Sequence, residues 1–502
     1  MPISWRLAFD KRTNFPEVDV AGIMRGVQLA RLLGEWQVRT HRRGPEYAAL
    51  AEAVRGLLTD GRLALGVRLP AERELADALG ISRTTVTAAY RTLRESGHLT
   101  SRRGAGSWTE LPGGHRIGSG GVIMTIDDGD DDVIDLNCAA LAAPPQITDA
   151  VQQAALDLPP YLSRRGYQPT GIVPLRELVA ARYTERGLPT DPEQIMITAG
   201  VQQGLDLLVR LFAAPGQRVL VEAPTYPNAL TSLASHRHRI LTYNLDANGW
   251  DPELMLSTLR GASARLAYLI PDFHNPTGHL MPEPLRARLP AVAHAAGTEL
   301  VIDESFADLR LDAGANPPPV AVYDRGARTI SIGGMSKPFW GGLRIGWIRA
   351  AAPTIARLAA LRVNVDMASP VLEQLIAVHL LHASDEIIAT RRRDLRAQRD
   401  ALVAALRAEV PQWRFTVPSG GLCLWIELDA PVATALARAA AELDLRIAPG
   451  PRFGVDGTFE RFMRMPYVLP VPQVREAVAR LAEARHRVER PTRRWAEPAV
   501  VA

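Results

Sequence analysis

Apolar residues recur at helical spacing in three stretches of the chain between residues 45 and 95. The apolar positions are Leu50, Val54, Leu57 and Leu58 in the first stretch, Leu75, Ala76 and Leu79 in the second, and Val86, Tyr90 and Leu93 in the third. Gly80 follows the second predicted helix, where freedom to adopt a positive φ is useful, and Ser82 is placed to cap the third. Two helices joined by a short glycine-containing turn predict a helix-turn-helix, although the same spacing also fits a helical protein-interaction module.

The pattern changes after about residue 134, where short β-rich runs alternate with longer helical stretches. The runs are IMIT (195–198), RVLVEAP (218–224), LAYLIPD (266–272), ELVIDES (299–305) and RTISIGG (328–334). This alternation predicts an α/β domain built on a mostly parallel sheet. Because ligands bind at the carboxyl ends of the strands in such sheets, we expect the chemistry to lie directly after these runs.

Charge marks the boundary between the two regions. Residues 38–107 carry 12 arginines against 7 acidic residues, and a Gly- and Ser-rich stretch at 111–121 separates them from six aspartates within 127–135. We interpret the acidic run as a solvated linker. The predicted organisation is an amino-terminal extension (1–44), a helix-turn-helix module (45–110), a linker (111–133), an α/β domain (134–490) and a tail (491–502).

Composition narrows the class of protein. Of the 502 residues, 47% are hydrophobic and 22% are charged, which is ordinary for a globular protein with an ample core. Apolar runs such as 266–270 are too short to span a bilayer, and the start has no apolar segment of signal-peptide length. Two cysteines, Cys138 and Cys423, give neither a disulfide framework nor metal-ligand spacing, so we expect no metal and a reducing cytoplasm. A net charge of +4 is too small to indicate nucleic-acid binding by itself.

Lysine is almost absent from this chain. Of 58 basic residues, only Lys11 and Lys337 are lysines. Arginine replaces lysine as a positive charge, but it cannot supply an amine that deprotonates and attacks a carbonyl. Lys337 follows the run 328–334 in the segment GGMSKPFWGGLRIGW, where a desolvated lysine could form a Schiff base with an aldehyde. The alternative is a surface lysine, which the scarcity of this residue disfavours.

The amino-terminal module resembles a known DNA-binding family. The segment LALGVRLPAERELADALGISRTTVTAAYRTLRESGHLTSRRGAGSW is similar to the winged-helix domain of the GntR family of bacterial transcription factors, with SRRGAG as the tip of the wing. The resemblance implies contacts with a double-stranded DNA operator from Arg73, Ser82, Arg83, Thr84, Thr85, Arg103 and Gly104. Arginine contacts to phosphates would make binding salt-dependent, and a short half-site for each domain implies a dimer.

Polar residues follow several of the strand-like runs. Asp303 could pair with a pyridinium nitrogen, Asn275 could donate to a phenolate oxygen, and Tyr226 offers a flat surface for a ring. Each of these residues has an ordinary alternative role. Asp303 could be a cap at a strand end, Asn275 part of an Asn-Pro turn, and Tyr226 a core tyrosine. The glycine turn at 200–202 opens a helix whose first N–H groups could bind phosphate, with Arg344 as a charged fork for the same group.

In this chain order, the segments resemble the fold-type I, pyridoxal-phosphate-dependent aminotransferases over roughly residues 135–485. The resemblance implies that Lys337 holds pyridoxal 5'-phosphate as a Schiff base, that Asp303 contacts its pyridine nitrogen, and that Asn275 contacts its 3-oxygen. The other implied contacts are Tyr226 to the ring, Gly200, Val201, Gln202, Ser336 and Arg344 to the phosphate, Tyr167 to the phosphate of the partner subunit, and Arg464 to an effector or substrate carboxylate. For Arg464, in the segment FMRMPYVLP, the alternative is one more surface arginine.

Two places depart from the aminotransferase pattern. Ser305 and Phe306 stand where the family commonly has a tyrosine that bonds the 3-oxygen of the cofactor. Gly334 stands where the family often has a phosphate-binding serine. These departures place efficient transamination in doubt more than covalent cofactor binding.

A GntR-type winged helix followed by an aminotransferase-like domain is the architecture of the MocR subfamily of regulators, which the chain resembles from about residue 45 to 485. In that subfamily the large domain serves as dimeriser and sensor, of pyridoxal phosphate itself in PdxR-like members and of an amine in others. We therefore expect a cytoplasmic, homodimeric regulator that is not an enzyme. An active aminotransferase with an appended DNA-binding domain is the alternative, and a domain that binds no cofactor and only dimerises is a third.

Overall fold

The structure is a computed structural model that describes residues 24, 26–33, 45–59, 63, 68–102, 106–110 and 133–489. The chain divides into two compact units. The smaller unit comprises residues 1–58 and 63–114, and the larger comprises residues 115–502 with the short segment 59–62. Most of the predicted linker, the tail, Lys11, Arg103 and Gly104 lie outside the described residues.

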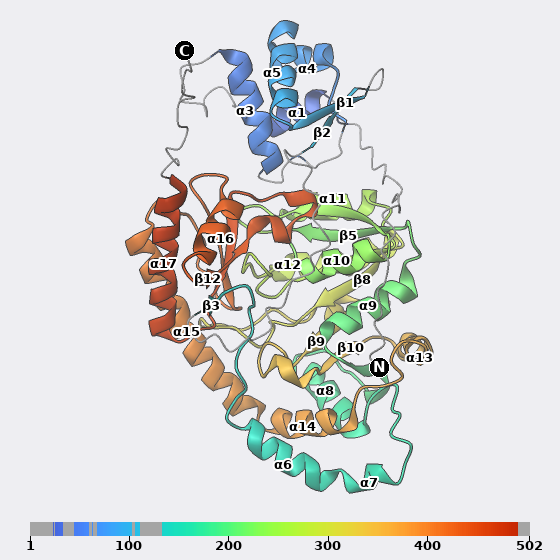
Figure 1. The fold of residues 1–502 in the computed structure, drawn as a ribbon. Coiled ribbons are helices and arrows are strands. Elements are labelled where there is room, and N and C mark those ends of the chain that lie inside the picture. The colour runs from blue at the N-terminus through green and yellow to red at the C-terminus, as the bar shows by residue number, and fades with distance from the viewer. Residues whose placement is uncertain are drawn as a thin grey trace, which may run out of the picture. The chain divides into compact units, whose positions relative to one another are not determined.

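Helices and one hairpin form the described part of the smaller unit (Figure 1). They are α1 (Gly26–Leu33), α3 (Glu46–Thr59), α4 (Glu72–Leu79), α5 (Arg83–Glu95), β1 (Leu99–Arg102) and β2 (Gly106–Thr109). The apolar faces predicted from the sequence meet in one core, where Leu50, Val86 and Leu93 are at most 1% exposed. Strands β1 and β2 pair antiparallel, with Leu99 opposite Thr109. The fold is therefore the predicted winged helix-turn-helix.

The turn between α4 and α5 has the capping chemistry that its sequence predicts. Gly80 adopts the left-handed conformation, at φ 66°, and its N–H donates to the carbonyl of Ala76. The Ser82 hydroxyl accepts a hydrogen bond of 3.0 Å from the N–H of Thr85 and so caps α5. The buried Tyr90 hydroxyl donates to the carbonyl of Pro70 over 3.0 Å. These local contacts fix the direction of α5 against the rest of the unit.

Helix α1 is an integral part of this core, although the sequence alone assigned no role to the extension that contains it. Leu29 is fully buried and Leu33 is 3% exposed. The N–H of Gly26 donates to the Glu74 carboxylate over 2.6 Å, and the N–H of Met24 donates to the Arg68 carbonyl over 3.0 Å. The compact smaller unit thus begins upstream of residue 45.

A seven-stranded sheet forms the centre of the larger unit, in the order β4-β10-β9-β8-β7-β5-β6. Its strands are β4 (Ile195–Thr198), β5 (Arg218–Ala223), β6 (Arg239–Asn244), β7 (Leu266–Leu269), β8 (Glu299–Asp303), β9 (Ile330–Gly334) and β10 (Gly346–Arg349). Only β10 runs against its neighbours within this sheet, which confirms the predicted mostly parallel arrangement. Alternate side chains are buried on opposite faces, with Val219 and Val221 in one core and Leu220 in another.

Helices cover both faces and the edges of this sheet (Figure 1). They are α8 (Val173–Glu185), α9 (Val201–Phe212), α10 (Pro227–Ser235), α11 (Pro252–Gly261), α12 (Glu283–Ala295), α13 (Ala352–Arg362) and α14 (Val371–His382). Farther from the sheet, α6 (Ile147–Asp157) packs on α14, and α7 (Pro159–Leu162) packs on α6. Helix α9 contacts the β8–β9–β10–β4 side of the sheet, while α12 packs on β8 and on α11. The carboxyl ends of the parallel strands are left to loops, and these loops carry most of the predicted site residues.

The carboxy-terminal part adds a small sheet and three helices. Its elements are β11 (Cys423–Glu427), β13 (Ala448–Pro449) and β14 (Phe462–Pro466), which pair antiparallel, and α15 (Ser384–Glu409), α16 (Ala433–Ala441) and α17 (Val471–Glu489). The short strand β3 (Ile134–Asp135) pairs with β12 (Leu445–Arg446), so the start of the larger unit is held against its end. In the described parts of the chain, no helix is both long and apolar enough to cross a membrane.

Candidate functional site

Lys337 lies in the turn that follows β9. Its side chain is partly buried, and its Nζ donates a hydrogen bond of 2.8 Å to the carbonyl of Ala139. The ring of Phe306 lies 5.8 Å from the same nitrogen. Burial lowers the pKa of the Lys337 amine, because the charged form loses hydration there. An amine with a lowered pKa is a better nucleophile at neutral pH than a surface lysine.

The Asp303 carboxylate is held at the end of β8 by three hydrogen bonds. Tyr268 donates its hydroxyl to one oxygen over 2.7 Å, and Ser305 donates both its backbone N–H and its hydroxyl to the other. Burial raises the pKa of Asp303, while the hydrogen bonds and the charge of Lys337 act in the opposite direction. Sequence reasoning missed Tyr268. The available signal was a tyrosine in an otherwise apolar, fully buried strand, because a buried hydroxyl needs a hydrogen-bond partner.

A cradle for an anion lies at the start of α9. Gly200 has φ 86°, and no side chain caps the first turn of this helix. Arg344 reaches across the turn and donates to the carbonyl of Ala199 over 2.8 Å. A Cβ at position 200 would lie 2.7 Å from the Arg344 guanidinium, so the close approach requires glycine. The first N–H groups of α9, from Val201 onward, and one guanidinium therefore lie together, as phosphate binding needs.

Gly334 is explained by crowding at the same helix. A Cβ at this position would lie 2.9 Å from a methyl group of Val201 and 3.1 Å from the carbonyl of Ile345. The serine that the aminotransferase pattern often has here would not fit without a shift of its neighbours. Ser336, two residues later and partly buried, is the hydroxyl that remains beside Lys337.

Two further predicted residues belong to loops after β5 and β7. Tyr226 precedes α10, and its hydroxyl accepts a hydrogen bond of 2.9 Å from Asn228. Burial raises the pKa of the Tyr226 phenol, so the ring stays neutral. Asn275 is 6% exposed, and its amide oxygen accepts from Arg464 over 3.3 Å. Asn275 and Arg464 thus meet, although 189 residues separate them in the sequence.

Arg464 is buried on β14 without a carboxylate partner among the described residues. It is 7% exposed, its guanidinium donates to the Asn137 carbonyl, and it lies 4.9 Å from the ring of Phe453. Its Nε has no hydrogen-bond partner in the described part of the chain. Burial lowers the pKa of Arg464. A buried donor left without an acceptor costs about 1–3 kcal/mol, so the arrangement favours an incoming carboxylate.

A buried polar cluster lies behind these loops and was missed by sequence reasoning. The Glu222 carboxylate, at the end of β5, accepts hydrogen bonds from Trp250 (2.8 Å) and from the N–H of Ile270 (2.9 Å). Nε2 of His274 lies 3.2 Å from the same carboxylate, and both side chains are fully buried. Because Asn275 follows His274, this cluster joins the loop after β7 to the strand that leads to Tyr226. The signal in the sequence was a glutamate at the end of the apolar run 218–224, with a histidine directly before Asn275.

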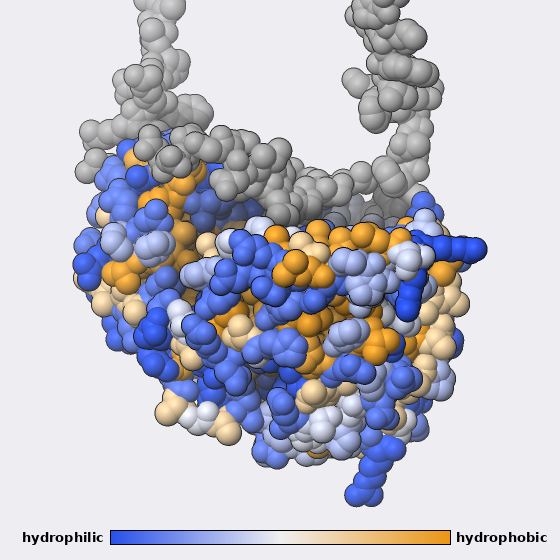
Figure 2. All heavy atoms as spheres, turned by 90° about the horizontal axis from the view of Figure 1, so that it is seen from below, coloured by the Kyte–Doolittle hydropathy of each residue, from blue (hydrophilic) through white to orange (hydrophobic). Residues whose placement is uncertain are grey.

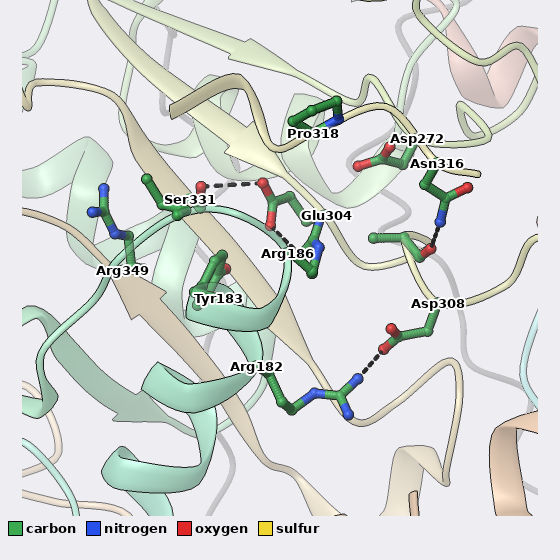
Figure 3. A network of polar contacts seen from close by, with 12 residues as sticks. Arg182, Tyr183, Arg186, Asp272, Glu304, Asp308, Asn316, Pro318, Ser331 and Arg349 are labelled. Atoms are coloured by element: carbon green, nitrogen blue, oxygen red, sulfur yellow. Dashed lines mark hydrogen bonds and ion pairs between the residues drawn. The ribbon is translucent and has the colours of Figure 1, made fainter. Parts of the chain in front are cut away.

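A second buried network fixes helix α8 to the turn after β8 (Figure 3). Glu304, directly after Asp303, accepts hydrogen bonds from Ser331 (3.2 Å) and from Arg186 (3.0 Å). Arg182 donates to Asp308 over 2.8 Å. Burial raises the pKa of Glu304. Because Arg182 lies on α8 and Arg186 directly follows its last residue, a movement of the Asp303 turn would be resisted by this helix.

Tyr167 is the predicted residue that does not join the buried group within one chain. It lies in the segment before α8 and is 61% exposed. The sequence predicts that it reaches the site of a partner subunit, and its exposure leaves it available for such a contact.

The predicted DNA-contacting residues of the smaller unit gather around the start of α5. Arg83 and Thr84 are exposed in the first turn, and Ser82 caps it. Arg73 is exposed on α4. The Arg83 guanidinium lies 3.7 Å from the carboxylate of Glu72, which orients it without burying it. Thr85, partly buried, completes the set that the structure describes.

Comparisons with known proteins agree with both halves of this description. The family of class I and II aminotransferases matches residues 132–481, and the gntR family of bacterial regulatory proteins matches residues 46–108. The chain belongs to the class I and II aminotransferase family. It carries a GntR-type module in front of that domain, which confirms the predicted MocR-type architecture.

Similar proteins include regulators and enzymes. An uncharacterised HTH-type transcriptional regulator of Bacillus subtilis, YisV, is 28% identical over 78% of this chain and 86% of its own length. The pyridoxine biosynthesis regulator PdxR of Corynebacterium glutamicum is 28% identical over 77% of this chain and 85% of its own. The solved α-aminoadipate aminotransferase LysN of Thermus thermophilus, complexed with N-(5'-phosphopyridoxyl)-L-leucine, is 31% identical, covering 70% of this chain and 92% of its own, with a TM-score of 0.64.

The cofactor implied by this family is pyridoxal phosphate, and the residues present fit it. An amine of lowered pKa, a buried carboxylate and an uncapped helix start with an adjacent guanidinium all lie in the larger unit. They provide groups for its aldehyde, its ring nitrogen and its phosphate respectively. Among the described residues, no cluster of three metal-ligating side chains occurs, and both cysteines are free.

Proposed function

We propose that this protein is a DNA-binding transcriptional regulator that holds pyridoxal phosphate on Lys337, and whose larger unit acts as dimeriser and effector sensor. One observation carries the proposal. A single chain combines an exposed helix start of DNA-reading type, at Arg83 and Thr84, with a buried lysine of lowered pKa beside Asp303. Two of the similar proteins are named as transcriptional regulators, which supports the same assignment.

Each group of the cofactor has an assigned holder. We assign Lys337 to the aldehyde, Asp303 to the pyridine nitrogen, Asn275 to the 3-oxygen and Tyr226 to the ring face. The phosphate is assigned to Gly200, Val201, Gln202, Ser336 and Arg344, with Tyr167 from the partner subunit. When bound, pyridoxal phosphate supplies an aldehyde that reacts reversibly with primary amines. Arg464 would hold the carboxylate of an incoming effector.

Sensing follows from competition for that aldehyde. Lys337 would hold the aldehyde when the cofactor is bound, and an effector amine would compete with it; a free Lys337 Nζ donates to the Ala139 carbonyl. If the two situations favour different arrangements of paired winged helices, effector binding and operator binding are coupled through their free energies. In the second mode of sensing, pyridoxal phosphate is itself the effector. The signal is then the fraction of Lys337 that carries the cofactor.

Apolar surface on the larger unit supports the dimer. Figure 2 views the face on which Figure 1 draws α6 and α14, and it shows apolar side chains gathered over this face. Exposed apolar residues of this region and its surroundings are Val151, Leu156, Leu162, Val173, Val363, Val365, Met367 and Leu372. A monomer rarely leaves so many large apolar side chains in water, and a second copy would cover them.

An active aminotransferase with a DNA-binding appendage is the second candidate. The retained group of Lys337, Asp303, Asn275 and Arg464 favours it. Against it, the buried Phe306 stands beside the lysine where a hydroxyl donor is usual, and Gly334 leaves the phosphate one hydroxyl fewer. Mixing the loaded protein with amino acids separates the two candidates. Steady release of a keto acid supports the enzyme, and a single-turnover spectral change supports the sensor.

The decisive experiment reduces the loaded protein with borohydride and locates the cofactor by mass analysis. We expect an adduct on Lys337 that is lost completely in Lys337→Ala. Footprints of the dimer on its upstream DNA, with and without pyridoxal phosphate, should differ for the native chain and coincide for Lys337→Ala. An absent adduct removes the cofactor from the proposal, and identical footprints and affinities of the native chain remove sensing. Lys337→Arg, which keeps the charge but not the amine chemistry, is the matched control.

A further inference from the structure

Two arginines converge on one asparagine beside the proposed effector site. Arg464, from β14, donates to the backbone carbonyl of Asn137. Arg452, from the short helix η4 (Gly450–Phe453), donates to the side-chain oxygen of Asn137 over 3.2 Å. The neighbouring Ala139 carbonyl accepts from Lys337. Three cationic side chains therefore meet one segment of three residues.

Neither arginine is neutralised by a carboxylate of the described residues. Three other buried arginines of the unit have acidic partners, namely Arg286 with Asp272 at 2.8 Å, Arg399 with Asp312 at 2.8 Å and Arg362 with Asp366 at 2.8 Å, whereas the buried Arg349 contacts Thr190. By contrast, the contacts of Arg464 are neutral groups, and its buried Nε has no partner in the described part of the chain. Arg452 is exposed and contacts the neutral Asn137 amide. Like charges held close together favour a ligand of opposite charge.

Contacts of Phe453 also fix the position of the Arg452 segment relative to Arg464. Phe453 follows Arg452 in the chain, and its ring lies 4.9 Å from the Arg464 guanidinium. The Phe453 carbonyl accepts a hydrogen bond of 2.8 Å from the N–H of Thr225, next to Tyr226. The pair is thus tied to the loop that we assign to the cofactor ring, and little ordering remains to be done when a ligand binds.

We propose that Arg452 and Arg464 together form a subsite for two acidic groups, so that the preferred effector is an amine carrying two carboxylates or equivalent anionic groups. Arg464 receives one group and Arg452 receives the other, in place of their contacts with Asn137. This rests on the proposed function, since the amine of such an effector would act at the cofactor held by Lys337. An effector with a single carboxylate leaves Arg452 without its anion and is bound more weakly.

The test uses acids that lack an amine, because their binding does not depend on the chemistry at Lys337. The full-length, cofactor-loaded protein is titrated by calorimetry with succinate, glutarate and adipate, and with butyrate, pentanoate and hexanoate as equally long monoacids. We expect the best diacid to bind about tenfold more tightly than its monoacid, as one added charge-assisted hydrogen-bonded contact allows. Arg452→Gln should remove this preference and leave monoacid affinity unchanged, whereas Arg464→Gln should weaken both classes.

Arg475→Gln, an exposed arginine on α17, is the matched control and should bind like the native chain. Equal affinity for diacids and monoacids, no binding of either, or an equal loss of both in Arg452→Gln would overturn the subsite. Borohydride capture on Lys337 is measured on the same samples. Capture without diacid preference rejects only the subsite, and diacid preference without capture rejects only the cofactor assignment.

Discussion

The start of α5 and the surroundings of Lys337 use polar side chains in opposite ways. At α5, Arg83 and Thr84 remain in water, and the chain folds without needing their partners. Around Lys337, the charged side chains of Asp303, Glu222 and Arg464 are buried, so each needs a partner from the chain or from a ligand. The comparison teaches that the exposed side chains at the start of α5 can be substituted without a loss of stability. The buried site and the fold of the larger unit, in contrast, depend on each other.

The strongest test of this comparison removes the carboxylate of Glu222. Glu222→Ala leaves the Trp250 indole and the N–H of Ile270 without their acceptor inside the fold, and removes the carboxylate 3.2 Å from Nε2 of His274. We expect a loss of about 3–5 kcal/mol in the free energy of unfolding, measured by chemical denaturation of the full chain. Glu253→Ala, at an exposed ion pair with Arg288, is the control and should unfold like the native chain. A cost no greater than that of the control would contradict the structural role of the buried cluster.

The smaller unit has its own buried dependence, at helix α1. Leu29→Ala should destabilise this unit by about 2–5 kcal/mol, because the side chain is fully buried in its core. Hydrogen exchange of the α4 amides in the full-length protein measures the effect locally. Val27→Ala, whose side chain is 67% exposed on the same helix, should leave exchange unchanged. Equal exchange in both variants would show that α1 is dispensable.

The exposed side of the comparison is tested at Arg83. Arg83→Ala should cost about 1–3 kcal/mol in operator affinity and, if the contact is to phosphate, reduce the salt slope by about 1. The melting temperature should stay unchanged, because the side chain is 70% exposed. Arg91→Ala is the matched control, on the same helix beyond the first turns and facing Glu95. Equal losses of affinity in the two variants would mean that charge alone, and not the start of α5, directs binding.

Ser82 lies between the two cases, because it both caps α5 and stands among the predicted DNA contacts. Ser82→Ala should cost about 1 kcal/mol of stability through the lost hydrogen bond to the Thr85 N–H, and Ser82→Gly only a few tenths. Thermal unfolding measures the cap, and operator titration measures the DNA contact. If Ser82→Gly keeps its stability but loses affinity, the hydroxyl acts on DNA directly, and if it keeps both, Ser82 is a cap only.

Local chemistry accounts for what the sequence could predict. Gly80 and Ser82 act within a few residues of themselves, and the strands ending at Asp303 and Gly334 are short runs rich in aliphatic residues, so these features follow from short patterns. The motifs around Lys337 also lie in single short segments. The order of strands could be anticipated only as mostly parallel, because the place of β10 between β4 and β9 depends on long-range pairing.

The features that the sequence did not predict depend on residues from distant segments of the chain. Tyr268 and Asp303 are 35 residues apart, and Trp250 and Glu222 are 28 apart, so neither pairing is visible in a local pattern. Gly334 could be read only as the loss of a serine, because the Val201 methyl group that occupies the space is on another element. Helix α1 was unassigned because an amphipathic segment of eight residues shows its purpose only when it meets α4.

The scarcity of lysine gives the position of Lys337 a use in covalent labelling. Apart from the amino terminus, the chain offers two primary amines to an acylating reagent, on Lys11 and Lys337. A reagent that discriminates by nucleophilicity therefore reports on the pocket with little background from other lysines. Occupancy of the pocket can thus be counted as the fraction of a single peptide that escapes modification.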